Sequence, residues 1–258
     1  MEYDKGYDMG NDMGNDMGKI YVIGIGPGDR RLMTDLGREA LEKSDVIVGY
    51  KVYIDLIRED YPEKEFLESG MREEILRCEK CIALAMEGKT VSLICSGDAG
   101  VYGMASPLLE VAEKEGFMDV EIIPGVTAAL AGAAILGAPV SHDFCTISLS
   151  DLLTPWELIE KRLRSAAEGD FCIVIYNPAS RKRADYLKKA CGILMEKLPE
   201  DTACGYVRNI GRDGCEKKVC TLKELAEEPV DMFVTVFVGN SRTRISDGKL
   251  ITPRGYKL

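Results

Sequence analysis

Three glycine-rich loops, each placed directly after a short apolar segment, restrict the fold of this chain more than any other feature of its sequence. The segments 19–24, 90–95 and 120–123 have the β-branched, apolar composition of buried strands. Glycine-rich loops at the carboxyl ends of strands line the crevice of an α/β sheet. The sequence therefore predicts an α/β protein with a ligand site at that crevice. The three loops are residues 24–29, 96–103 and 124–129.

Strand and helix patterns alternate along the rest of the chain, which predicts mostly parallel pairing in at least the first half. We expect two α/β domains, 19–124 and 125–258, divided at Pro124-Gly125, where a strand meets a helix breaker. The cleft between two domains is a common place for a ligand. Further strands are expected at 45–48, 145–149, 171–175, 203–207 and 232–238. Helices are expected at 31–43, 71–87, 101–115, 126–136, 155–167 and 182–197.

The first 18 residues repeat the pattern Asp-Met-Gly and contain nothing that could pack, so we expect a disordered leader at 1–18. The formal net charge of −10 argues against a nucleic-acid partner. The longest apolar run, residues 126–140, is shorter than the roughly 20 residues that span a bilayer. We therefore expect no membrane association and a cytoplasmic location.

Nine cysteines, an odd number, in a chain without an export signal predict free thiols rather than a disulfide framework. Cys78 and Cys81 form a lone C-x-x-C in a predicted helix, with no second pair at a suitable spacing. The chain also contains a single histidine, His142. We therefore predict no metal site.

The residue types in the loops limit the classes of ligand that the site can bind. Asp29 stands where a dinucleotide fingerprint requires its third glycine, and Pro27 lacks the N–H that would hold a pyrophosphate. A tight strand-to-helix turn is the alternative interpretation of this loop. Asp98 offers one fixed acceptor to a ligand with hydroxyl, amino or cationic groups, or else caps the helix that follows. Thr127 has the same two options.

The three loop motifs resemble those of one known protein family. The patterns G-x-G-P-G-D at 24–29, S-G-D-x-x-x-Y-G at 96–103 and P-G-V-T-A at 124–128 resemble those of the tetrapyrrole methylases. Within that family the chain is most similar to the members that methylate C17 of precorrin-3B or cobalt-factor III and contract the ring. The resemblance covers about residues 19–250. The closer match rests on residues 48–53, 142–145, 148–156, 176–181 and 207–212.

The resemblance implies a two-domain α/β architecture with the donor site in the cleft between the domains. It implies S-adenosylmethionine as methyl donor, a carboxylate-rich tetrapyrrole of cobalamin biosynthesis as acceptor, and a homodimer. Because the donor is already activated, the protein mainly has to align the methyl group with the acceptor carbon. The donor contacts implied by the family pattern are Pro27, Ser96, Gly97, Asp98, Val101, Thr127, Ala128, Asn177 and Gly211.

Candidate catalytic residues are His142, whose intrinsic pKa suits acid/base chemistry during ring contraction, and Tyr50. A histidine satisfied by local hydrogen bonds is the alternative for His142, and contact with the macrocycle is the alternative for Tyr50. Cations that could meet acceptor carboxylates are the remaining candidates. They are Lys51, Arg181, Arg208 and Arg212.

Two other functions stay open at this point. One is a methyltransferase of the same fold with a different acceptor, either another corrin carbon or a ribosomal RNA ribose. The net negative charge argues against the RNA acceptor. The other is a non-catalytic module that binds an adenosyl or corrinoid ligand without turnover.

Overall fold

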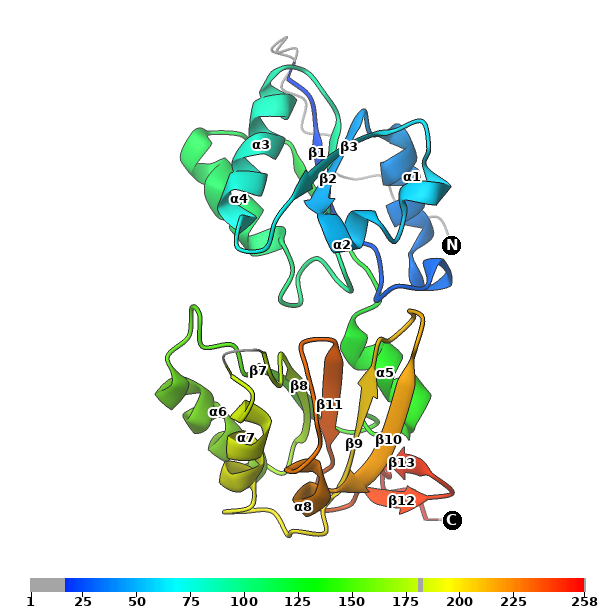
Figure 1. Ribbon diagram of the computed structural model, residues 1–258, viewed down its shortest axis with the longest axis vertical. Helices are drawn as coiled ribbons and strands as arrows, with labels where there is room; N and C mark the ends of the chain where they lie inside the picture. The colour runs from blue at the N-terminus through cyan, green and yellow to red at the C-terminus, as the bar shows by residue number, and fades with distance from the viewer. Residues whose placement is uncertain (1–16, 181–182, 258) are drawn as a thin grey trace.

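The computed structural model describes residues 17–180 and 183–257. These residues form two lobes, stacked one above the other in Figure 1, and each lobe is built around a five-stranded sheet. Most of the predicted leader, residues 1–16, lies outside the described residues, and so does Arg181.

The first sheet is entirely parallel, as the alternating pattern predicted, with the order β3-β2-β4-β1-β5. The central strand β4 is buried along its whole length, which explains its continuous apolar run. The strands are β1 (Ile20–Gly24), β2 (Val46–Tyr50), β3 (Glu65–Ser69), β4 (Val91–Cys95) and β5 (Val120–Ile123).

Helices cover both faces of this sheet. On one face, α3 (Glu74–Met86) and α4 (Ala105–Glu115) bury residues such as Cys78, Cys81 and Leu108. On the other face, α1 (Asp35–Lys43) and the short α2 (Lys51–Ile54) bury Leu41 and Ile54. Two 3₁₀ turns, η1 (Arg30–Leu32) and η2 (Arg58–Asp60), complete the lobe.

The second sheet is mixed, with the order β10-β9-β11-β8-β7. Only β7 and β8 pair in parallel, whereas β11 runs antiparallel to both β8 and β9. Because β11 lies between them, β8 and β9 point in the same direction. The strands are β7 (Phe144–Ser148), β8 (Cys172–Tyr176), β9 (Ala203–Arg208), β10 (Glu216–Thr221) and β11 (Val234–Val238).

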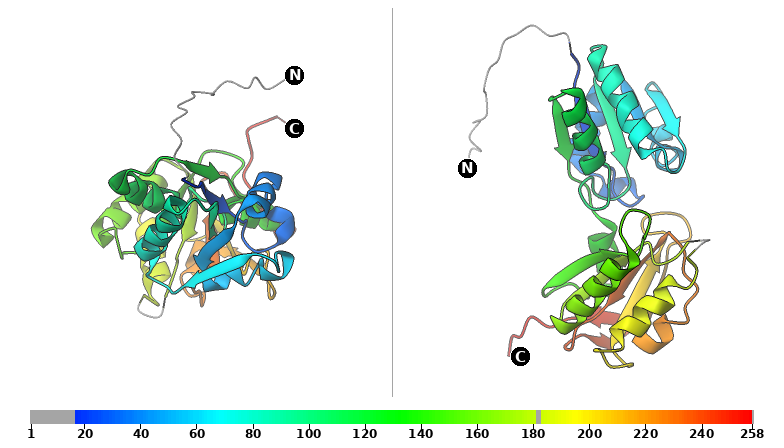
Figure 2. Two further views of the ribbon diagram at one scale, coloured as in Figure 1. Left: turned by 90° about the horizontal axis from the view of Figure 1, so that it is seen from above. Right: turned by 90° about the vertical axis from the view of Figure 1, so that its left-hand side faces the viewer.

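This sheet is also covered on both faces (Figures 1 and 2). One face carries α6 (Trp156–Glu168), α7 (Tyr186–Leu194) and α8 (Leu222–Leu225). The other face carries α5 (Ala128–Leu136) and, through Leu250, a small third sheet. That sheet has the order β12-β13-β6, with β12 (Arg244–Ser246), β13 (Lys249–Ile251) and β6 (Gly137–Ala138).

Several predicted helices begin later than their sequence pattern suggested. The pattern at 101–115 becomes α4 only from Ala105, because 101–103 belong to the loop after β4. The pattern at 31–43 divides into η1 and α1, since Thr34 caps α1 by accepting the Gly37 N–H at 3.1 Å. The domain boundary at Pro124-Gly125 stays a prediction.

The carboxyl ends of the strands bring the two lobes' loops together. Strands β1, β4 and β5 are parallel, so the loops that follow them lie at one edge of the first sheet, which faces the second lobe in Figure 1. Strands β7, β8 and β9 end at the edge of the second sheet that faces the first lobe. Residues far apart in the sequence therefore meet at the junction.

Candidate active site in the cleft between the lobes

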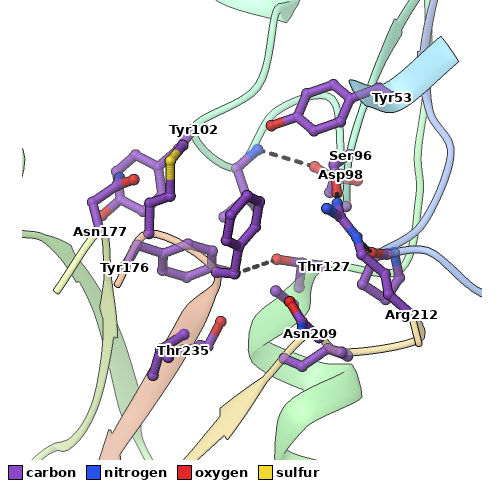
Figure 3. Close-up of a pocket in the computed structure, with 18 of the residues that line it drawn as sticks. Tyr53, Ser96, Asp98, Tyr102, Thr127, Tyr176, Asn177, Asn209, Arg212 and Thr235 are labelled. Atoms are coloured by element: carbon purple, nitrogen blue, oxygen red, sulfur yellow. Dashed lines mark hydrogen bonds between the residues drawn. The ribbon is translucent and has the colours of Figure 1, made fainter. Parts of the chain in front are cut away.

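A cavity of about 940 Å³, including its open mouth, lies where the loops of the two lobes meet. Figure 3 shows residues of both lobes around it. Its lining consists of Pro27, Tyr50, Tyr53, Ser96, Gly97, Asp98, Val101, Tyr102, Thr127, Ala128, Tyr176, Asn177, Asn209, Ile210, Arg212, Met232, Phe233, Val234 and Thr235.

The three glycine-rich loops form one floor because their backbones touch. Gly26 and Gly97 exchange two backbone hydrogen bonds, of 3.0 and 2.7 Å. A side chain at Gly125 would place its Cβ 2.2 Å from the Gly97 carbonyl oxygen and 2.4 Å from that of Gly24. Glycine is therefore required there by close approach of backbones. The three loops therefore pack into one surface, and residues from each of them line the cavity.

Asp98 ties two of these loops together. One carboxylate oxygen accepts the N–H groups of Gly100 and Val101 at 2.8 and 3.1 Å, and the other accepts that of Gly125 at 3.0 Å. The carboxylate therefore shapes the loop after β4 and fixes it against the loop after β5. Asp98 lines the cavity but does not cap the following helix as the alternative interpretation supposed, because α4 begins after Met104 and has no side-chain capping bond.

The amino end of α5 faces the cavity, and Tyr176 caps it. The Tyr176 hydroxyl lies 2.6 Å from Thr127 Oγ1 and accepts the Ala129 N–H at 2.9 Å. Thr127 is the residue before the helix, but its own side chain makes no capping bond. Burial raises the pKa of Tyr176, so the hydroxyl remains protonated near neutral pH.

Arg212 reaches from the second lobe to two loops of the first. Its Nε donates to the Pro27 carbonyl at 2.9 Å, and its Nη2 donates to Ser96 Oγ at 3.0 Å. A second link is made by Tyr102, whose hydroxyl donates to the Thr146 carbonyl at 3.1 Å. The two lobes are therefore linked at Arg212 and at Tyr102, both of which line the cavity.

Ten residues singled out from the sequence line this cavity together. Among the expected donor contacts, only Gly211 is absent from the lining. Tyr50, the catalytic candidate, and Arg212, a cation expected to bind the acceptor, are part of it. The other eight are Pro27, Ser96, Gly97, Asp98, Val101, Thr127, Ala128 and Asn177.

His142 is not brought to the cavity. It precedes β7, whose carboxyl end at Ser148 faces the cleft, so His142 lies at the opposite end of that strand. A five-residue strand is about 16 Å long. His142 is exposed, and its Nδ1 accepts the Asp143 N–H at 2.9 Å. The structure thus supports the interpretation of a locally satisfied histidine, and the acid/base role predicted for it is not supported.

Two further candidates are engaged elsewhere. Arg208 forms an ion pair with Asp231 and donates to the Pro229 carbonyl at 2.9 Å, outside the cavity lining. Lys51 is exposed and lies 3.4 Å from a carboxylate oxygen of Glu68. Both cations are paired with acidic side chains of this protein and neither lines the cavity, so their role in binding the acceptor stays a prediction.

The backbone geometry explains why position 211 is a glycine. Its φ is +69°, and a Cβ there would lie 2.7 Å from the Asp29 amide nitrogen. It therefore allows the loop after β9 to approach the loop after β1. Arg181 lies outside the described residues, so its predicted role as an acceptor-binding cation stays a prediction.

The sequence analysis missed much of the aromatic wall. Tyr53, Tyr102, Tyr176 and Phe233 all line the cavity, and the Tyr102 and Tyr176 rings lie 5.1 Å apart. The first three stand inside the motifs that carried the resemblance, and that position was the available signal. Phe233 follows no motif. The backbone at Tyr102, Asn177 and Asn209 has positive φ, of 54, 52 and 51°, which the sequence did not indicate.

The C-x-x-C pair is part of the core. Cys78 and Cys81 are buried on α3, and burial raises the pKa of Cys78 to about 11 and that of Cys81 further. Among residues 17–180 and 183–257, no three His, Cys, Asp or Glu side chains gather as metal ligands would. No helix in the same residues is long and apolar enough to cross a membrane.

The lining suits a ligand that is partly flat and partly polar. Aromatic rings provide surfaces for a planar group, while main-chain groups and hydroxyls provide hydrogen bonds. Asp98 is the one acidic side chain in the lining, and both of its oxygens already accept hydrogen bonds. An adenosyl group with its amino-acid tail has this mixed character, so the residues present fit it.

Comparison with known proteins agrees with this architecture. A "Probable cobalt-factor III C(17)-methyltransferase" of Salmonella typhimurium is 49% identical over 92% of this chain and 99% of its own length. A "Precorrin-3B C(17)-methyltransferase" of a Sinorhizobium species is 39% identical over 92% of this chain and 96% of its own length.

Solved structures are similar throughout the fold. The crystal structure of the methyltransferase CobJ superposes with a TM-score of 0.84 at 37% identity, covering 92% of this chain and all of that one. A uroporphyrin-III C-methyl transferase from Thermus thermophilus, complexed with S-adenosyl homocysteine, has a TM-score of 0.67 at 21% identity, covering 86% of this chain and 92% of that one. The latter likeness shows the fold alone.

The family described as "Tetrapyrrole (Corrin/Porphyrin) Methylases" matches residues 19–226, which is most of the chain and includes every loop that contributes to the cavity up to Arg212. Together with relatives that share up to 49% of their residues over nearly their whole length, this match establishes the family. The chain is a member of the tetrapyrrole methylases.

Proposed function

We propose that this protein transfers a methyl group from S-adenosylmethionine to C17 of a tetrapyrrole in cobalamin biosynthesis and contracts the macrocycle. The observation that carries the proposal is the identity of 39–49% to C17-methyltransferases over 92% of the chain. The cobalt-factor III relative is more similar than the precorrin-3B relative, which favours a cobalt-containing acceptor. S-adenosylmethionine supplies a methyl group already activated on a sulfonium.

The task left to the protein is positioning, and the cavity supports it. The floor of three loops is held in one arrangement by Asp98, and the α5 end of the site is held by Tyr176. Arg212 and Tyr102 fix the two lobes relative to each other. Alignment of reacting groups in a pre-formed site lowers the barrier because little freedom is lost at the moment of reaction.

The direct test uses purified full-length protein with S-adenosylmethionine labelled in its methyl group. Cobalt-factor III and the metal-free precorrin-3B are supplied separately, and each product is analysed by mass spectrometry and by NMR of the labelled methyl. We expect label on C17 of the cobalt-containing acceptor. Label on another carbon would instead support a methyltransferase of the same fold with a different position.

A non-catalytic module is the second function to be separated. Such a module would bind S-adenosyl homocysteine and the tetrapyrrole, yet transfer no label to either acceptor. We also propose a homodimer in the cytoplasm. Light scattering of the purified protein tests the dimer, and a single-chain mass would contradict it.

A further inference from the structure

Arg212 carries a positive charge that no acidic side chain in the described residues neutralises by an ion pair. Its guanidinium lines the cavity and is half-buried. Two of the five N–H groups that a guanidinium offers are used, one by the Pro27 carbonyl and one by Ser96 Oγ. The remaining three have no partner among residues 17–180 and 183–257. Burial removes water from a guanidinium, and an opposite charge compensates best for this loss of hydration. A half-buried, unpaired cation of this kind therefore favours a bound anion.

Tyr53 stands beside this guanidinium with a hydroxyl that is also unused. The Arg212 Cζ lies 5.9 Å from the centre of the Tyr53 ring and 5.9 Å from that of Phe233. Figure 3 shows the Tyr53 hydroxyl pointing into the pocket, and no described residue bonds to it. Burial raises the pKa of Tyr53, so the hydroxyl is protonated near neutral pH and able to donate.

The opposite wall has no comparable charge. Tyr102, Tyr176 and Asn177 are neutral, and the Asp98 carboxylate is occupied by backbone N–H groups. Loss of water around Arg212 lowers the pKa of its guanidinium, which is the direction expected for a cation that lacks a counter-ion. The cavity therefore has one cationic corner, made by Arg212 and Tyr53.

We propose that Arg212 and Tyr53 form a carboxylate subsite, in which the guanidinium and the phenol donate hydrogen bonds to one carboxylate of a bound ligand. The inference rests on the proposed function, which offers two sources of this group. One is the amino-acid carboxylate of the methyl donor, and the other is an acidic side chain of the tetrapyrrole. Arg212 is also an inter-lobe contact, so filling the subsite stabilises the closed arrangement of the lobes.

The test measures binding rather than turnover. Isothermal titration of the full-length protein uses three ligands: S-adenosyl homocysteine, 5′-methylthioadenosine, which lacks the amino-acid carboxylate, and cobalt-factor III. The variants are Arg212→Met, Arg212→Lys and Tyr53→Phe. Arg164→Met is the matched control, because that guanidinium is already paired with Glu160 and Glu196 on the surface of α6. Circular dichroism and thermal unfolding verify that each variant is folded.

We expect Arg212→Met to lower the affinity for one of the carboxylate-bearing ligands by about tenfold or more, which is the usual loss for a hydrogen-bonded ion pair. Arg212→Lys and Tyr53→Phe should each lower this affinity by a smaller factor, and Arg164→Met should leave it unchanged. If the donor supplies the carboxylate, the variant binds S-adenosyl homocysteine more weakly than the wild-type protein does, whereas its affinity for 5′-methylthioadenosine is unchanged. If the acceptor supplies the carboxylate, only the affinity for cobalt-factor III falls.

Two results would overturn the subsite. One is unchanged affinity for all three ligands in Tyr53→Phe and in the folded Arg212 variants. The other is an equal loss for S-adenosyl homocysteine and 5′-methylthioadenosine without any loss for cobalt-factor III, which would make Arg212 a loop-holding residue only. If Arg212→Met does not fold, the lysine and phenylalanine variants decide by the same criteria. Failure of the wild-type protein to bind any ligand would overturn the proposed function itself, and the subsite with it.

Discussion

Replacing Asp98 by alanine removes a carboxylate that accepts three backbone N–H groups from two loops. The bonds from Val101 and Gly125 are partly buried, whereas the one from Gly100 is exposed. A hydrogen bond to a charged group contributes about 1.5 kcal/mol or more when it is shielded from water. Counting the two shielded bonds fully and the exposed one as negligible, Asp98→Ala should lower the free energy of unfolding by about 3 kcal/mol.

The same change should weaken donor binding, because the loops after β4 and β5 are no longer held against each other. Asp98→Asn separates the contributions: its amide oxygen can still accept from Gly100 and Val101, but its NH₂ group cannot accept from Gly125. We expect about half the loss of stability in this variant. Asp201→Ala, at an exposed position, is the control and should change stability by less than about 0.5 kcal/mol.

The assay is urea unfolding followed by circular dichroism, with titration of S-adenosyl homocysteine on the same samples. An Asp98→Ala protein with the control's stability would refute the reasoning, because the three hydrogen bonds would then contribute nothing to the fold. Normal stability together with weak donor binding would mean that the carboxylate acts on the ligand and not on the loops.

Three other predictions follow from the same geometry. Gly125→Ala should unfold at a clearly lower urea concentration, because its Cβ would lie 2.2 Å from the Gly97 carbonyl oxygen, whereas Gly192→Ala, inside α7 with nothing within 4 Å, should be neutral or slightly stabilising; equal midpoints would contradict this. His142→Ala should leave the rate of labelled-methyl transfer unchanged, and a slower rate at unchanged donor affinity would restore the catalytic role. Burial raises the pKa of Cys78 from 9.0 to about 11, so the native state keeps a proton that the unfolded state loses, and stability should fall as the pH rises from about 9 to about 11. Cys78→Ala should show a smaller fall over that range in urea unfolding, and an identical fall would contradict the assignment.

The order of strands and helices could be read from the sequence because both depend on local patterns. Buried strands such as β4 appear as apolar runs, and each of the three loops was recognised by its glycines. Within the two five-stranded sheets, the strands that the sequence analysis missed are β3 and β10, which lie at sheet edges and expose charged side chains such as Glu65 and Lys217. An edge strand needs no continuous apolar run, so its pattern resembles a loop.

The start of α4 shows a second limit. Its apolar pattern continues back to Val101, yet the chain from 96 to 103 is bent around Asp98 and begins its helix only at Ala105. Pro107 lies in the first turn of that helix, where proline is tolerated because the N–H is not needed. This residue was a local signal for the true start.

By itself, the sequence determined the α/β class, the parallel first sheet and the loops that line the cavity, since each depends on residue types close together in the chain. Only the tertiary structure decided which cations reach that cavity. Arg208 and Arg212 are four positions apart, yet one is paired with Asp231 and the other bridges to Pro27 and Ser96. His142 has suitable chemistry but stands at the wrong end of β7. The direction of a strand and the partner across the cleft are set by long-range packing, which no local pattern contains.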